Sequence, residues 1–147
     1  MKSFHSFRKV LCATFTLLSI TVIGFAQQDI GSFNTSPVVY NQTVNYTTLR
    51  SKYSSNKAAV VNVKSNNGDQ KGYVQQLSNS NASSMTCWAR DINGNKKTVS
   101  KIVSDNSRVT IDYSSYPADT TIQYKLSCQN KNNYDIKIAG SWSPDES

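Results

Sequence analysis

The chain has 147 residues with 16 basic and 9 acidic side chains, a formal net charge of +7, and a hydrophobic fraction of 37%. This length supports one small domain with a core of its own. One histidine and three cysteines leave little material for histidine-based catalysis or for a cysteine-rich zinc site.

The first 26 residues have the order of a secretory signal peptide. A basic segment with Lys2, Arg8 and Lys9 precedes an apolar run over residues 10–24, and Ala26 ends the stretch that follows. This order predicts export to the extracellular side, with cleavage after Ala26. A retained membrane anchor is the alternative, although the apolar run is at the short limit for spanning a bilayer.

Cleavage would change the chemistry available to the rest of the chain. Residues 27–147 keep 13 basic and 9 acidic side chains, so the net charge becomes +4, and they contain no histidine. Their two cysteines, Cys87 and Cys128, predict one disulfide in an oxidising compartment, with two free thiols as the alternative. No cofactor and no metal site are expected, because no other cysteine or histidine could complete a zinc site.

The composition after residue 26 favours strands over helices. Ten valines and seven isoleucines stand against three leucines, and β-branched residues fit a pleated, half-buried surface. Residues 27–48 are polar and predict an extended N-terminal arm that can add one edge strand. A strand is then expected over residues 59–64, and Asn67-Gly68 predicts a hairpin that returns along residues 71–77.

The next strand contains the first of the two cysteines. Met85, Cys87 and Ala89 share one face of it, and Asn93-Gly94 predicts a hairpin turn into a return strand over residues 97–103. Alternation of apolar and polar residues then predicts strands at 109–113, 122–129 and 134–142, with turns at 105–106 and 116–119 between them.

These elements together predict the fold class. In the strand over residues 122–129, Cys128 lies on the apolar face, as Cys87 does in its own strand, which predicts a disulfide that crosses the core. We expect an all-β, single-domain antiparallel β-sandwich of about seven strands over residues 49–143, with a C-terminal tail over residues 144–147. A small β-barrel is the alternative.

The residue types of common enzymes are sparse after residue 26. Without a histidine, Ser-His-Asp and Cys-His centres are excluded, and the single glutamate, Glu146, lies in the expected tail. The aspartates fall mostly in expected turns or, like Asp112, on faces expected to be exposed, so the paired carboxylates of a glycosidase are not expected. Ser54-x-x-Lys57 is a pattern that arises readily by chance in so serine-rich a chain. The chain is therefore predicted not to be an enzyme.

The candidate binding site is a surface of aromatic and basic side chains. Trp88 is out of phase with the inward-facing residues of its strand, and aromatic and arginine residues are favoured anchors for partners or sugars. Packing of Trp88 in a second core layer is the alternative. The candidate surface consists of Trp88, Arg90, Lys97, Tyr113 and Tyr116.

Two short segments resemble a known family. Residues 50–53 (Arg-Ser-Lys-Tyr) lead through Asn56 into residues 58–63, and residues 139–142 (Ala-Gly-Ser-Trp) precede an acidic ending at Glu146. With the signal peptide, these segments resemble the small secreted proteins of Gram-positive bacteria that share domain of unknown function 2712. The resemblance implies secretion and small size, and it implies no site residues.

These observations predict a secreted, non-enzymatic binding protein that acts at or near a bacterial cell envelope. The expected partner is a protein, an envelope polysaccharide or an anionic polymer, and the membrane is contacted only through the signal peptide before cleavage. No nucleic acid is expected, because the basic residues are scattered along the chain. The alternatives are a secreted antagonist of the bacteriocin type and a histidine-free hydrolase that uses Asp112 or Lys57.

Overall fold

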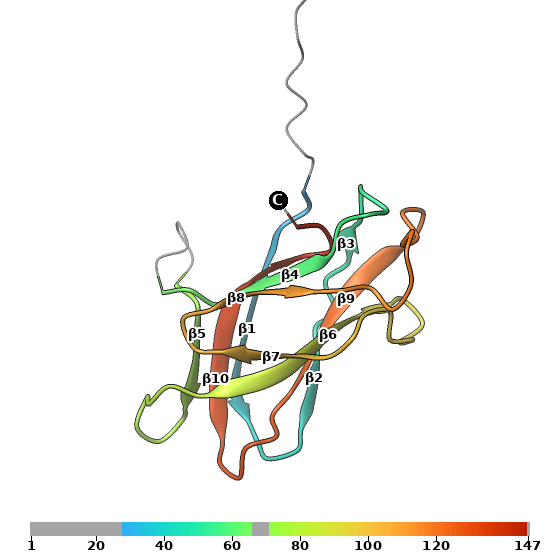
Figure 1. The fold of residues 1–147 in the computed structure, drawn as a ribbon. Coiled ribbons are helices and arrows are strands. Elements are labelled where there is room, and N and C mark those ends of the chain that lie inside the picture. The colour runs from blue at the N-terminus through green and yellow to red at the C-terminus, as the bar shows by residue number, and fades with distance from the viewer. Residues whose placement is uncertain (1–27, 66–70, 147) are drawn as a thin grey trace, which may run out of the picture.

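The computed structural model describes residues 28–65 and 71–146, so the predicted signal peptide and the predicted Asn67-Gly68 hairpin turn lie outside the described residues. The described chain forms ten strands and no helix. The strands make two five-stranded antiparallel sheets that pack face to face (Figure 1). The sheets do not close into a barrel, so the predicted all-β sandwich is confirmed and the barrel alternative is not.

Sheet A is built around the last strand of the chain. β10 pairs with β1 along one side, and β4 and β5 lie one after the other along its opposite side. The expected strand at 71–77 therefore forms as β5, but it pairs with β10 and not with β4 as a hairpin would require. The strands of sheet A are β1 (Gly31–Val38), β10 (Ile136–Ser143), β4 (Ala59–Asn62), β8 (Arg108–Ile111) and β5 (Tyr73–Gln76).

Sheet B contains the second predicted hairpin. After β6 the chain turns at Asn93-Gly94 and returns to form β7, which pairs with β6. Gly94 takes a φ of +91°, a conformation that favours glycine. The neighbour of β6 on its other side is β9, which also pairs with β2 and β3. The strands of sheet B are β2 (Thr43–Asn45), β9 (Gln123–Gln129), β6 (Ser84–Asp91), β7 (Lys101–Ser104) and β3 (Arg50–Ser51).

The segment expected as an N-terminal arm belongs to the sandwich. β1 lies along β10 from the pair Gly31 and Trp142 to the pair Val38 and Ile136, and β2 joins the other sheet. The segment thus supplies an edge strand to each sheet, where one edge strand was expected. Phe33 and Val38 reach the core, while the residues between them are mostly exposed, which explains the polar composition.

The core lies between the sheets and follows the predicted alternation. Met85, Cys87 and Ala89 of β6 are buried, as are the inward residues of β9 and β10. Cys87 and Cys128 form the predicted disulfide, but they are directly opposite partners on β6 and β9 with Cα atoms 4.1 Å apart. The prediction that the bridge crosses the core is therefore wrong: both cysteines point inward from the same sheet.

The expected C-terminal tail folds back onto the sandwich. Lys52, in the loop after β3, pairs with Asp145 inside the protein and also donates to the carbonyl oxygen of Pro144. Its ammonium lies 4.2 Å from the centre of the Tyr113 ring. The backbone N–H of Glu146 donates to the carbonyl oxygen of Ala58. Residues 144–146 are therefore an integral part of the domain.

Candidate functional site

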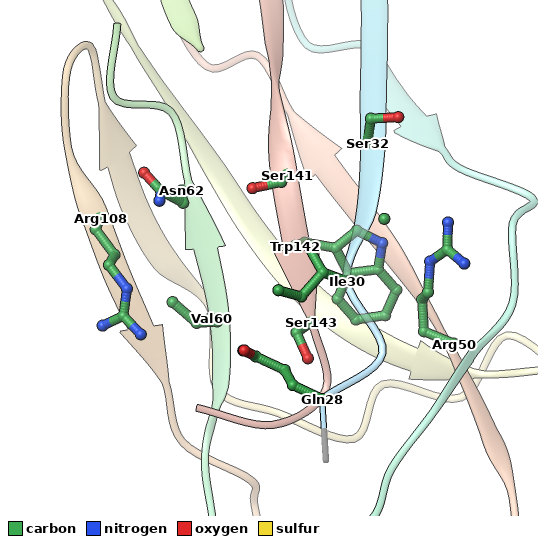
Figure 2. A pocket seen from close by; sticks show the side chains of 11 residues that line it. Gln28, Ile30, Ser32, Arg50, Val60, Asn62, Arg108, Ser141, Trp142 and Ser143 are labelled. Carbon is green, nitrogen blue, oxygen red and sulfur yellow. The ribbon is translucent and has the colours of Figure 1, made fainter. Parts of the chain in front are cut away.

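A hollow of about 540 Å³ lies at the end of sheet A where β1 begins and β10 ends (Figure 2). Register places four polar residues of its lining in one row across four strands. Ser32 is opposite Ser141, Ser141 is opposite Asn62, and Asn62 is opposite Arg108. The row faces outward, because the neighbouring residues along these strands, such as Phe33 and Val61, enter the core.

Two arginines stand on opposite sides of this hollow, with Ile30 and Trp142 between them (Figure 2). Each is held by a carboxylate from outside the lining. Arg50 Nη1 lies 3.3 Å from Asp29 Oδ1, and Arg108 Nη1 lies 3.4 Å from Glu146 Oε1. Such pairing orients the planar guanidinium groups, which then present further N–H donors in a fixed geometry.

Glycine at position 31 makes room for one of these arginines. A Cβ at Gly31 would overlap the guanidinium group of Arg50, so no larger residue fits without displacing it. The backbone N–H of Ser51 also donates to Asp29, at 2.8 Å, which fixes the carboxylate that holds Arg50. This edge of the hollow is therefore built from two separate segments of the chain, residues 29–31 and 50–51.

The structure divides the predicted aromatic-basic surface. Trp88 and Arg90 are half-buried on the outer face of sheet B. Lys97 instead pairs with Asp91, which points toward the interior, at 3.3 Å. Hydrogen bonds from Asn95, together with Lys97, lower the pKa of Asp91 to about 2. Lys97 is therefore an ion-pair partner and does not belong to the Trp88 face.

The two predicted tyrosines of that surface lie elsewhere. Tyr113 is buried between the sheets, where its hydroxyl donates to the carbonyl oxygen of Pro144 at 2.9 Å. Burial raises the pKa of Tyr113 well above its usual value. Tyr116 is 45% exposed and contacts the Tyr113 ring edge to face. Tyr113 is thus a core residue, and the five predicted residues do not form one surface.

Sequence reasoning missed the residues of the hollow. Ser32, Asn62, Arg108 and Ser141 are far apart in the chain, and no motif joins them. Alternation places Ser141 on the face opposite Trp142, but only strand register reveals which other side chains lie beside it. The sequence could therefore predict on which face of its strand each residue lies, but not which residues of other strands lie beside it.

The described residues contain no group of three or more histidine, cysteine, aspartate or glutamate side chains that could hold a metal ion. The described residues also contain no helix that is long and apolar enough to cross a membrane. Comparison with family models, with curated proteins and with solved structures gives no match to this chain. The resemblance to domain of unknown function 2712 stays a prediction.

Proposed function

We propose that the protein is secreted, is not an enzyme, and binds a polysaccharide of the bacterial cell envelope through the hollow of sheet A. The observation that carries the proposal is the outward row of Ser32, Ser141, Asn62 and Arg108 inside a hollow of about 540 Å³. This volume lies in the usual range of small-ligand sites, roughly 300–1,000 Å³.

The chemistry of the lining suits a sugar. Sugar hydroxyls both donate and accept hydrogen bonds, and serine hydroxyls and an asparagine amide do the same. The arginines add fixed donors at either side. Ile30, which is 58% exposed, supplies apolar surface against which the C–H face of a sugar ring can pack.

The described lining supports binding and offers no hydrolytic pair. Hydrolysis of a glycosidic bond commonly needs two facing carboxyl groups. The described residues that line the hollow include neither aspartate nor glutamate, and the nearby Asp29 and Glu146 are engaged by the arginines. Export is supported by the basic, apolar and small-residue order of the first 26 residues.

The test uses protein purified from culture supernatant, whose intact mass also reports whether cleavage occurs after Ala26. Isothermal titration with purified wall polysaccharide fragments should give saturable binding. Asn62→Ala should weaken it about three- to tenfold, the worth of one or two hydrogen bonds. Asn34→Ala is the matched control. Asn34 lies on the same outward face of β1 as Ser32, but it is outside the lining of the hollow. Equal affinities for the two variants would refute a role for the hollow.

A further inference from the structure

Three basic residues lie directly opposite one another on the outer face of sheet B. Arg90 of β6 is the register partner of Lys125 on β9 and of Lys96 in the segment that follows the hairpin. Directly opposite residues share one face of a sheet. With strands about 4.8 Å apart, the row spans on the order of 10 Å. We name these three residues the basic row.

This arrangement is unfavourable for the protein alone. Like charges placed directly opposite each other destabilise a sheet. The five strands of sheet B contain one acidic residue, Asp91, which is 6% exposed, faces the interior and is engaged by Asn95 and Lys97. The charges of the basic row therefore find no carboxylate within their own sheet, and an external anion would relieve the repulsion.

The central member of the row is held in place. Arg90 Nε donates to Ser127 Oγ at 2.8 Å, and Arg90 Nη2 donates to the carbonyl oxygen of Tyr46 at 3.3 Å. Ser127 in turn donates to Asn45 Oδ1 at 2.7 Å. The guanidinium thus lies across β9 toward β2 in a defined orientation, which reduces the entropy lost when a ligand binds.

We infer that the basic row is a second binding site, separate from the hollow, that takes the phosphate groups of a linear polyol-phosphate polymer. Arginine presents a fork of N–H donors to phosphate, and lysines bind it as point charges. Asn45, which is exposed on the neighbouring strand β2, offers its amide group to the polyol, and the buried Ser127 holds that amide by donating to Asn45 Oδ1. Because the hollow involves sheet A, one molecule could bind two envelope polymers from opposite sides.

The same face is poorly suited to nucleic acid. Binding of single strands relies on bases that stack on open aromatic rings. Trp88 is the one aromatic residue that the described strands of sheet B place outward, and the Lys96 ammonium lies over its ring, 5.9 Å from the centre. The face therefore combines cations with hydrogen-bonding groups and offers no stacking platform.

The test measures binding of the secreted protein to purified poly(glycerol phosphate) at low and at physiological salt. Lys96→Gln with Lys125→Gln should weaken binding by at least about tenfold, because each lysine near an anionic surface contributes roughly fivefold. The matched control, Lys64→Gln with Lys71→Gln, removes the same charge from exposed positions outside sheet B and should stay within about twofold of the wild type. Asn62→Ala should also bind as the wild type does, which separates this site from the hollow.

Three outcomes would overturn the inference. The first is a wild type that does not bind the polymer at low salt. The second is an equal loss in both lysine variants, which would show attraction by net charge alone. The third is tighter binding to single-stranded DNA than to polymer at equal phosphate concentration, which would indicate a nucleic-acid site. A thermal melt without polymer serves as the folding control, and the Lys96 and Lys125 variant should melt no lower than the wild type.

Discussion

Lys52 and Asp145 form an ion pair inside the protein, with Lys52 Nζ 2.9 Å from Asp145 Oδ1 and side chains that are 0% and 2% exposed. The ammonium also donates to the carbonyl oxygens of Lys57 and Pro144. The carboxylate accepts the backbone N–H of Tyr53 at 2.6 Å. The pair is therefore fully hydrogen-bonded, and it fastens the chain after β10 to the loop after β3.

Replacing Lys52 by methionine should lower the free energy of unfolding by about 3–5 kcal/mol, because it leaves a buried carboxylate without its cation. Urea denaturation followed by tryptophan fluorescence measures the change. Lys97→Gln is the control: it breaks the pair of a 39% exposed side chain and should cost less than about 1 kcal/mol. Similar losses in the free energy of unfolding for both variants would contradict the prediction that the buried pair contributes more than the exposed one.

Replacing Cys87 and Cys128 by alanine should lower the free energy of unfolding by about 4 kcal/mol. The bridge closes a loop with a sequence separation of 41, and in the chain-entropy model its loss restores the freedom of that loop in the unfolded state. Denaturation of the wild type with and without a reductant should show the same difference. A stability unaffected by reduction would contradict the prediction.

The protein should lose stability above about pH 10, where free tyrosines ionise. Burial raises the pKa of Tyr46 and Tyr124 to about 12 and that of Tyr113 further. Raised values mean that the unfolded state releases these protons first, so the stabilisation is complete below the unfolded pKa and falls as pH rises. Burial lowers the pKa of Lys52, and this shift alone would make stability rise with pH. The shifts of the three tyrosines outweigh that of the single lysine.

Ultraviolet absorbance of tyrosinate, recorded with circular dichroism during an alkaline titration, checks this prediction. The last tyrosines should ionise only as the sheet signal disappears. Complete ionisation of all tyrosines in a folded protein would contradict it.

Gly140→Ala should lower the free energy of unfolding by about 1–3 kcal/mol through overpacking. A Cβ at this position would lie 2.5 Å from the carbonyl oxygen of Asn62 and 3.1 Å from the Phe33 ring. Because Asn62 also lines the hollow, the variant should bind wall polysaccharide more weakly than its loss of stability alone explains. Thermal denaturation and the polysaccharide titration measure the two effects, and an unchanged melting temperature would contradict the first.

The sequence predicted what depends on local alternation. Alternation predicts Met85, Cys87 and Ala89 on the inward face, and Asn93-Gly94 predicts the hairpin turn, because a period of two residues and a glycine turn are properties of neighbouring residues. Strand pairing is not such a property. The row from Ser32 to Arg108 exists only through register between strands distant in the chain.

The errors at the predicted surface have the same origin. Lys96 and Lys97 are adjacent, and register alone assigns Lys96 to the face of Arg90 and turns Lys97 toward Asp91. Tyr113 is predicted on the surface, but it is buried in the core, where the carbonyl oxygen of Pro144 accepts a hydrogen bond from its hydroxyl. Asp145 falls in the expected C-terminal tail, and no local pattern reveals its cation, because Lys52 lies 93 positions earlier in the chain.

The position of the disulfide within one sheet limits how far the protein can be stretched. Gly31 and Trp142 are partners at the same end of sheet A, so a load applied through the two ends of the chain would peel β1 from β10 one pair at a time. The load would pass through the covalent link between Cys87 and Cys128, so the residues between the two cysteines, which are 41 positions apart, would not be extended. At about 3.4 Å per residue, the fully extended protein would be roughly 140 Å shorter than its reduced form. A molecule tethered at both ends would thus keep the loop between Cys87 and Cys128 closed while the rest of the chain carries the load.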